Sequence, residues 1–159
     1  LFSTSFQLSK LPDIWKTAIV TPIFKKGCPS SASNYRPISL TCIISKVMET
    51  IIKDKLIAYL LENKLITKEQ HGFLANHSTC SQLLECTNDW SLELNVKHCV
   101  DVAYIDFQKA FDSVVYSKLC HKLTAYGVSG TLLQWLTDFL FNHSQAVKVN
   151  NKVSIVTVQ

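Results

Sequence analysis

Residues 17–60 read TAIVTPIFKKGCPSSASNYRPISLTCIISKVMETIIKDKLIAYL, and this stretch decides the fold class. Its first part, Thr17–Lys26, is β-branched and apolar and ends in two lysines, which indicates a strand that runs into a turn. The polar segment Cys28–Asn34 has the length of a hairpin connection. Tyr35–Thr41 is extended again, because Pro37 disfavours helical backbone at the residue before it. We therefore expect two strands joined by a polar loop.

The second half of this stretch carries the strongest helical pattern in the chain. Apolar residues recur at steps of three and four with lysines between them, as in a helix with one face in a core. These apolar residues are Ile44, Val47, Met48, Ile51, Ile52, Leu56 and Leu60. Strands that lead directly into a long helix predict a mixed α/β or α+β fold.

A second helix is expected further along the chain, after a glycine-containing loop at Gln70–His77. Ser78 or Thr79 can cap its first turn, and the helix should continue to about Leu94. The side chains expected to face the core are Leu83, Leu84 and Trp90.

The remaining segments add one strand, two helices and a hairpin. Cys99–Phe107 (CVDVAYIDF) is a nearly continuous apolar run, which indicates a buried central strand. Helices are expected near Ser117–Tyr126 and Gly130–Phe141. Gln145–Val149 and Val153–Val158 flank a polar Asn-Asn-Lys turn and predict a hairpin. No internal repeat or domain boundary is evident.

Composition excludes several classes of protein. The 159 residues are 47% hydrophobic and 18% charged, which suffices for one domain-sized core and is unlike a disordered chain. The longest uncharged stretch, Leu123–Thr137, is shorter than the roughly 20 residues of a membrane span. The six cysteines form no C-x-x-C pair, which favours reduced thiols in an intracellular protein. The chain opens on Leu1 rather than Met, so an incomplete domain is expected.

The charge is mildly basic, with a formal net charge of +4. This suits a polyanionic partner without requiring one. Arg36 is the sole arginine among 16 basic residues, so it is the one candidate for a planar, bidentate phosphate contact. Lys25 and Lys26 end the first strand, and a hairpin would bring them near Arg36. Such a basic tip could hold a triphosphate, although lysines at strand ends are ordinarily solvated surface.

Asp106 is the chemical anomaly of the expected strand. A carboxylate on a buried strand is costly unless it is paired, hydrogen-bonded or bound to a metal. At the carboxyl end of the strand it could face a ligand cleft and bind Mg²⁺, which takes few protein carboxylates. It could equally cap a turn or accept backbone N–H bonds, and its position alone leaves both alternatives open. Asp112 is expected to cap the next helix and Asp101 to be solvated.

Four blocks of sequence together resemble the reverse transcriptase of non-LTR (LINE-type) retrotransposons of the jockey kind. A single D-F-x-x-A-F-D match would be weak, but the blocks occur in that family's order over nearly the whole chain. They are LPDIWK at 11–16 with AIVTPIFKKG at 18–27, NYRPISL at 34–40, QHGF at 70–73 with Ser78 and Thr79, and VAYIDFQKAFD at 102–112.

The resemblance implies a right-hand polymerase of α+β class, with helices packed on a small, mostly antiparallel sheet. Residues from about 11 to 95 would form the fingers and those from about 96 to 159 the first part of the palm. The remaining palm and the thumb would be absent, so residues 1–159 would be one incomplete domain. The implied partners are an RNA template, a DNA primer and deoxynucleoside triphosphates, in the cytoplasm and nucleus; no membrane and no obligate protein partner is implied.

The resemblance also implies roles for single residues. Asp106 would be the first metal-binding aspartate, beside the backbone carbonyl of Phe107, in a site that uses two Mg²⁺ ions for phosphoryl transfer. Phe111 would lie under the incoming sugar and disfavour a ribose 2′-OH. Lys25 or Lys26, with Arg36, would hold the triphosphate, and both lysines remain candidates. The residues expected near the template are Gln70, Gly72 and Phe73.

The chain departs from the family pattern in three places. It has no adjacent Asp pair, whereas the family site needs a Y/F-x-D-D turn downstream of the first aspartate. It also lacks a G-x-P-Q-G segment, since its last proline is Pro37 and its last glycine Gly130. Leu74 and His77 stand where the family commonly has arginine. This favours a decaying copy of the element, or one that has drifted toward lysine-rich coding. The expected function is a polymerase fragment that is inactive alone; the alternatives are a non-catalytic nucleic-acid-binding remnant or an unselected pseudogene product.

Overall fold

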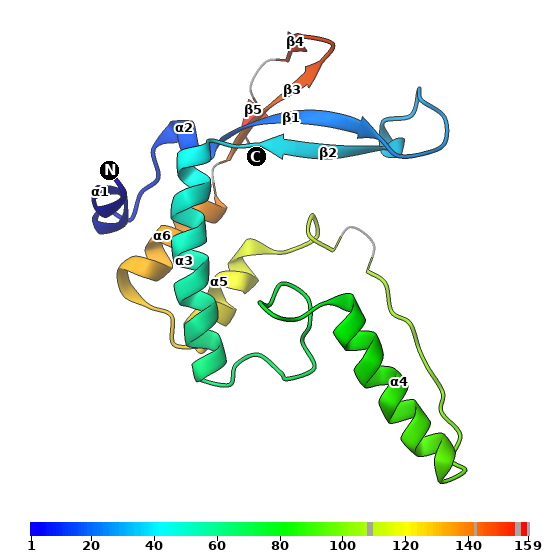
Figure 1. Ribbon diagram of the computed structural model, residues 1–159. Coiled ribbons are helices and arrows are strands. Elements are labelled where there is room, and N and C mark those ends of the chain that lie inside the picture. Colours follow the sequence, from blue (N-terminus) through cyan, green and yellow to red (C-terminus); the bar gives the residue numbers. More distant parts are fainter. Residues whose placement is uncertain (108–109, 142, 155–156, 159) are drawn as a thin grey trace. The chain divides into compact units, whose positions relative to one another are not determined.

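The computed structural model describes residues 1–107, 110–141, 143–154 and 157–158 (Figure 1). These residues divide into two compact units, which are described separately: a first unit of Leu1–Ile57 with Val114–Gln159, and a second unit of Ala58–Ser113. The elements in chain order are α1 (Phe2–Gln7), α2 (Asp13–Lys16), β1 (Thr17–Phe24), a short 3-10 helix (Ala32–Asn34), β2 (Tyr35–Leu40), α3 (Ile43–Glu62), α4 (Thr79–Asn95), α5 (Tyr116–Ala125), α6 (Gly130–Leu140), β3 (Ser144–Val149), β4 (Lys152–Val153) and β5 (Thr157–Val158).

The sheet of the first unit has the order β2-β1-β3-β4, and β5 also pairs with β3. The β1–β2, β3–β4 and β3–β5 pairs are antiparallel, whereas β1 and β3 run parallel from the pair Thr17 and Ser144 to the pair Val20 and Val147. The mixed α+β class and the mostly antiparallel sheet are therefore confirmed, as are both predicted hairpins. The hairpin prediction over Val153–Val158 includes residues 155 and 156, which lie outside the described residues.

Two prolines face each other in the β1–β2 hairpin without interrupting it. Pro22 pairs with Pro37, and the Lys25 N–H donates to the Asn34 carbonyl oxygen at 2.9 Å. Because bonded and non-bonded pairs alternate along an antiparallel ladder, this bond places the proline pair at a non-bonded level. β3 pairs with β1 only as far as Val20, so Pro22 lies beyond the level at which β3 would need its N–H.

The core of the first unit lies between the N-terminal segment, α3 and α6. Trp135 of α6 is 1% exposed and stacks on Phe139 at 5.7 Å between ring centroids. Its indole N–H donates to the Ser5 hydroxyl at 3.1 Å, so the polar atom of the buried ring is satisfied. The other buried members of this cluster are Leu11, Trp15, Met48 and Ile52. Each large apolar side chain buried here contributes about 1.5–3 kcal/mol relative to exposure.

A carboxylate of α6 joins that helix to the N-terminal segment of this unit. Asp138 of α6 accepts from the Leu11 N–H at 2.7 Å and pairs with the Lys16 ammonium at 2.7 Å. The Lys16 side chain is only 11% exposed, so an ammonium group without this partner would be poorly solvated there. We call these contacts of Asp138 with Leu11 and Lys16 the clamp. The clamp fixes α2, and with it the start of β1, against α6.

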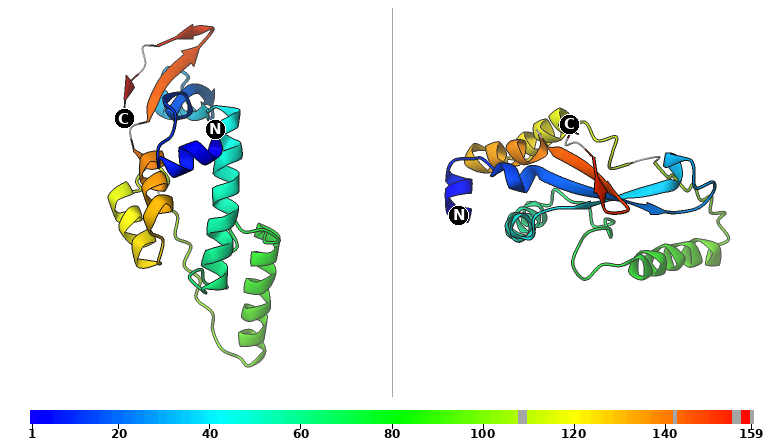
Figure 2. Two further views of the ribbon diagram at one scale, coloured as in Figure 1. Left: turned by 90° about the vertical axis from the view of Figure 1, so that its left-hand side faces the viewer. Right: turned by 90° about the horizontal axis from the view of Figure 1, so that it is seen from above.

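α3 confirms the strongest helical prediction, but only part of its apolar pattern enters the core. Met48 and Ile52, one turn apart, are buried, whereas Ile44, Val47 and Ile51 are about half exposed. The right-hand view of Figure 2 looks along α3. The helix is apolar on two sides, and the described part of the first unit covers one of them. Neither α3 nor any other helix in the described residues is long and apolar enough to cross a membrane.

In the second unit α4 begins where the sequence predicted. Ser78 is the cap residue: it accepts from the Ser81 N–H at 3.1 Å, and its own N–H donates to the Ser81 hydroxyl at 2.9 Å. The predicted core positions are wrong for Leu83 and Leu84, which are 60% and 70% exposed, and Trp90 is half-buried. No residue of α4 is buried, because the other described segments of this unit are mostly irregular and offer little apolar surface to pack against.

The prediction of a buried strand over Cys99–Phe107 is wrong. Residues 98–107 have irregular backbone, and all their side chains are exposed apart from the half-buried Val100. The physical reason is the lack of a neighbour: the described strands pair with one another and none pairs with this segment. An apolar run becomes a strand only where another strand supplies ladder hydrogen bonds. α5 and α6, which follow, confirm the two predicted helices.

The clamp gives a direct test of stability. Asp138→Ala should lower the free energy of unfolding by about 2–3 kcal/mol, because it leaves the poorly solvated Lys16 ammonium and the Leu11 N–H without a partner. Urea titration followed by tryptophan fluorescence measures the change. Asp54→Ala is the matched control, since the Lys53–Asp54 pair is more than 60% exposed on both sides and should cost less than about 0.5 kcal/mol. Equal losses in the two variants would contradict the clamp.

Candidate functional site

The basic tip of the β1–β2 hairpin contains Lys25, Lys26 and Arg36, all exposed. Arg36 pairs with Ile23, and the ladder continues to Lys25 through its bond to Asn34. Residues two apart on a strand share a face, and directly paired residues lie on the same face. Lys25 therefore shares a face with Arg36, whereas Lys26 lies beyond the last bond of the ladder, in the turn. This distinction between the two lysines was not available from the sequence.

The turn at this tip depends on one glycine. Gly27 has φ +91°, and a Cβ at this position would lie 2.7 Å from the Asn34 side-chain nitrogen. That nitrogen donates to the Cys28 carbonyl oxygen at 2.9 Å, and the Tyr35 hydroxyl donates to the Pro29 carbonyl oxygen at 2.9 Å. Hydrogen bonding from the Ser30 side chain and backbone lowers the pKa of the Cys28 thiol. The loop between the lysines and Arg36 is thus fixed by its own contacts.

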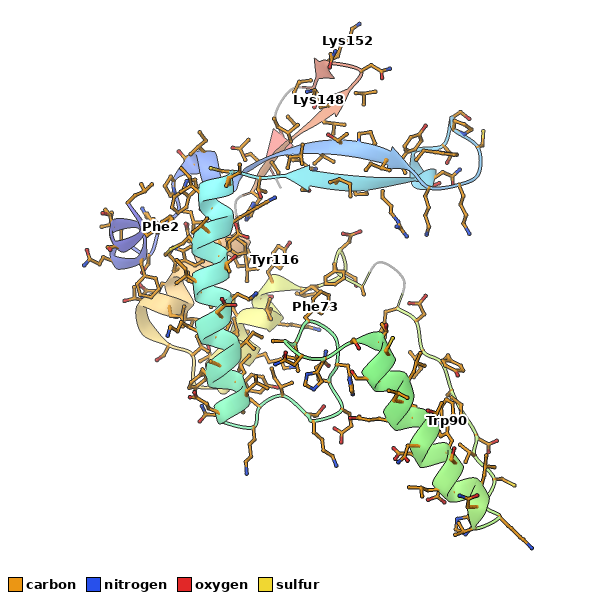
Figure 3. The ribbon with its side chains drawn as sticks, in the orientation of Figure 1. Phe2, Phe73, Trp90, Tyr116, Lys148 and Lys152 are labelled. Carbon is orange, nitrogen blue, oxygen red and sulfur yellow. The ribbon has the colours of Figure 1, made fainter. Side chains whose placement is uncertain are left out.

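The loop before α4 contains Gln70, Gly72 and Phe73, which the sequence placed near a template (Figure 3). The Gln70 amide donates to the Gly72 carbonyl oxygen at 2.9 Å. Phe73 has φ +64° and an 88% exposed side chain. Its ring meets that of Phe111 edge to face, with centroids 5.9 Å apart. Two residues expected to contact different parts of a substrate therefore form one exposed aromatic pair.

His71, in the same loop, was missed by the sequence reasoning. It is 6% exposed, and its two ring nitrogens lie 3.0 Å from the Ser81 hydroxyl and 3.0 Å from a Glu85 carboxylate oxygen. The one available signal was that Ser81 and Glu85 are four residues apart and so share a face of α4. Nothing in the sequence indicated which residue would bind that face.

Asp106 lies in the exposed irregular segment that replaces the predicted strand. Among the described residues it makes no hydrogen bond or ion pair, so the alternative of a turn-capping carboxylate has no contact to support it there. Phe107 is 76% exposed. Within the same described set, no group of three or more His, Cys, Asp and Glu side chains is arranged to hold a metal ion. Asp106 and Phe107 offer oxygen donors to solvent rather than a formed metal centre.

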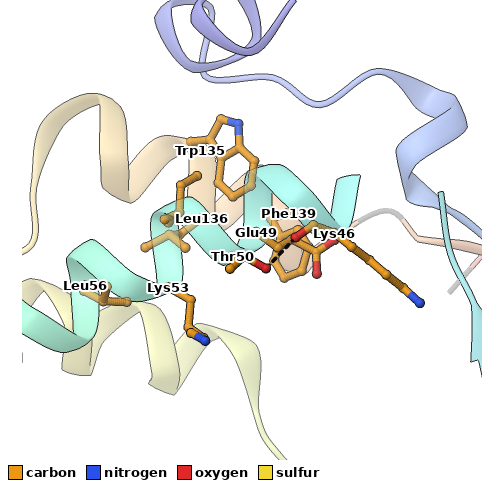
Figure 4. Close-up of a pocket in the computed structure, with 9 residues that line it drawn as sticks. Lys46, Glu49, Thr50, Lys53, Leu56, Trp135, Leu136 and Phe139 are labelled. Atoms are coloured by element: carbon orange, nitrogen blue, oxygen red, sulfur yellow. Dashed lines mark hydrogen bonds between the residues drawn. The ribbon is translucent and has the colours of Figure 1, made fainter. Parts of the chain in front are cut away.

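The candidate residues fall in both units. Lys25, Lys26 and Arg36 belong to the first unit, and the others belong to the second. The first unit also has an apolar groove of about 550 Å³ between α3 and α6 (Figure 4). Trp135, Leu136 and Phe139 contribute its α6 side, and Lys46, Glu49 and Lys53 provide charged groups on its α3 side. None of the predicted site residues lines this groove.

The chain is similar over 99% of its length, at 31% identity, to the "Probable RNA-directed DNA polymerase from transposon BS" of Drosophila melanogaster. It is 32% identical over 77% of its length to the "RNA-directed DNA polymerase from mobile element jockey" of the same species. A type-1 retrotransposable element R2 polyprotein of Popillia japonica is 24% identical over 87% of the chain.

These matches cover only a small part of the relatives. The chain spans 17% of the transposon BS protein, 13% of the jockey protein and 19% of the R2 polyprotein. Residues 23–158 match the family described as "Reverse transcriptase (RNA-dependent DNA polymerase)". That range includes every candidate residue from Lys25 to Phe111. The chain belongs to the reverse transcriptase family, as a partial-length homologue of the RNA-directed DNA polymerases of jockey-type non-LTR retrotransposons.

Proposed function

We propose that this chain forms the fingers, over about residues 11–95, and the first part of the palm, over about 96–159, of a polymerase that copies RNA into DNA during retrotransposition. Its partners are an RNA template, a DNA primer and deoxynucleoside triphosphates, and it acts in the cytoplasm and nucleus. The family match over residues 23–158, which contains all the candidate residues, carries this proposal.

The basic tip is the proposed triphosphate contact. Lys25 and Arg36 share a face of the hairpin, so both can approach one polyphosphate, whereas Lys26 lies in the turn beyond the ladder. Arg36 offers a planar fork that matches two phosphate oxygens, and Lys25 adds a compact charge. This arrangement neutralises charge and positions the nucleotide, which is what phosphoryl transfer chiefly requires of the protein.

Asp106 and the backbone carbonyl of Phe107 are the proposed metal ligands. Both supply oxygen, the donor type that Mg²⁺ prefers, and the exposed carboxylate has no competing partner among the described residues. When bound, a pair of Mg²⁺ ions neutralises the reacting phosphate and activates the primer hydroxyl. Asp106 supplies one carboxylate to such a pair and cannot hold both ions by itself.

The aromatic pair is proposed to contact nucleic acid. Phe111 lies under the incoming sugar and disfavours a ribose 2′-OH, and Gln70, Gly72 and Phe73 lie along the template. The exposed rings of Phe73 and Phe111 support this assignment, since exposed aromatic faces stack on bases of any sequence. A nucleic-acid-binding remnant without catalysis is the second candidate, and the same aromatic pair favours it.

The hairpin register distinguishes the two lysines. Lys25→Ala should weaken binding of a deoxynucleoside triphosphate about tenfold, which corresponds to about 1.4 kcal/mol for one lost charged hydrogen bond. Lys26→Ala is the matched control and should change the affinity less than about twofold. Titration with a fluorescent deoxynucleoside triphosphate in the presence of Mg²⁺ measures both. A larger loss for the Lys26 variant would contradict the assignment.

The purified chain should show no primer extension on an RNA template with Mg²⁺. The reason is that the chain contains no two consecutive aspartates, which together with Asp106 would complete a site for two ions about 4 Å apart. Gel-resolved extension of a labelled primer is the measurement, with a complete reverse transcriptase as the positive control. Metal-dependent extension that disappears in Asp106→Asn would refute the expected inactivity while supporting Asp106 as a ligand. Salt-dependent binding of an RNA–DNA hybrid without extension would favour the remnant.

A further inference from the structure

In the described residues two histidines, His71 and His98, pair with a glutamate, and His71 is the buried one. Its side chain is 4% exposed, whereas its partner Glu85 is 65% exposed. One ring nitrogen contacts Ser81 and the other contacts Glu85, each at 3.0 Å, so both polar atoms of the ring are satisfied by α4. The ring also meets the His77 ring edge to face, with centroids 5.0 Å apart. His71 thus joins both ends of its own loop to the helix that follows.

Ser81 ties this contact to the start of α4. Its hydroxyl accepts from the Ser78 N–H and donates to the Ser78 carbonyl oxygen, both at 2.9 Å, as part of the helix cap. The cap and the His71 contact therefore meet at one oxygen atom. A change in the ring position of His71 has to disturb the first turn of α4 or break the bond to Ser81.

The loop that His71 holds has an unusual backbone. Phe73 and Asn76 have φ values of +64° and +62°, in the left-handed region that is unfavourable for most side chains. Such conformations persist where surrounding contacts over-determine them, and they cluster at ligand sites. His71 lies two residues before Phe73, and His77 follows Asn76 directly. The buried ring is therefore placed to maintain the strained position of Phe73.

We propose that His71 is a positioning residue that holds Phe73 against Phe111, so that the Phe73 ring presents a stacking face to a base of the single-stranded RNA template while Phe111 stays under the incoming sugar. This inference rests on the proposed function of the chain as a template-binding part of a polymerase. His71 itself, being buried, touches no nucleic acid. It acts by fixing the backbone from which the 88% exposed Phe73 ring projects (Figure 3).

The chain provides a matched control for this contact. His98 also meets a glutamate of α4, with its Nδ1 atom 2.7 Å from a Glu93 carboxylate oxygen. In contrast to His71, the His98 side chain is 67% exposed. Replacing His98 removes a histidine–glutamate pair from the same helix without touching the loop.

The experiment compares His71→Ala, His71→Asn, His71→Gln, Phe73→Ala and His98→Ala in the full 159-residue chain. The first readout is the NMR cross-relaxation between the Phe73 and Phe111 rings, whose centroids are 5.9 Å apart. The second is the affinity for a short single-stranded RNA of adenosine at low salt, since high salt suppresses such binding. Far-UV circular dichroism verifies that each variant retains its helices.

His71→Ala should abolish the ring-to-ring signal and weaken RNA binding about fivefold or more, matching Phe73→Ala, because one stacked base is lost. His71→Asn places an amide near Nδ1 and keeps the Ser81 bond, and His71→Gln reaches toward Glu85. In both variants the ring-to-ring signal and the RNA affinity should therefore lie between those of the unsubstituted chain and those of His71→Ala. Such a partial rescue would not be expected if His71 only filled space. His98→Ala should change neither readout.

Two results would overturn the inference. A retained Phe73–Phe111 signal in a folded His71→Ala chain shows that the loop does not depend on His71. A lost signal with unchanged RNA affinity shows that the ring position does not matter for binding. If the unsubstituted chain binds no RNA even at low salt, the template-binding function fails, and the ring-to-ring signal alone then decides whether His71 positions Phe73.

Discussion

The Asp138 carboxylate is the constraint on which the first unit depends. It binds the Leu11 N–H and the Lys16 ammonium, partners more than 120 residues away in the chain. β1 starts at Thr17, directly after Lys16, and its first parallel partner is Ser144, shortly after α6 ends. The clamp therefore sets the level at which β1 and β3 meet. Because β2 pairs with β1, the position of the basic hairpin tip follows from the same carboxylate.

Local signals predicted most of this fold, and non-local ones explain the errors. The Ser78 cap, the β1–β2 hairpin and the helical pattern of α3 each depend on neighbours within a few residues, so the sequence carries them directly. Whether an apolar residue becomes buried depends on a partner surface that no local pattern specifies. Leu83 and Leu84 of α4 and the segment 99–107 were predicted wrongly for that single reason.

The candidate site divides in the same way. The residue types at Lys25, Arg36 and Phe73 could be selected from the sequence, but their pairing could not. A register shift of one residue would have placed Lys25 and Arg36 on opposite faces, because faces alternate along a strand. The Phe73–Phe111 contact joins residues 38 positions apart through irregular backbone, where periodicity has no meaning. The burial and the contacts of His71 could be found only in the structure, since a buried loop histidine has no sequence signature.

The structure also changes the physical argument for Asp106. On a buried strand its charge would have been costly, and that cost first singled it out. In an exposed irregular segment the carboxylate is solvated at no such cost, so its role rests on the family match. Its neighbours Tyr104, Ile105 and Phe107 are each more than 75% exposed. If this segment became a strand with both of its faces covered, those side chains would be buried and Asp106 would be desolvated with them. The buried carboxylate would then need hydrogen-bond donors, an ion-pair partner or a metal ion, and the last of these is the role that the family assigns to it.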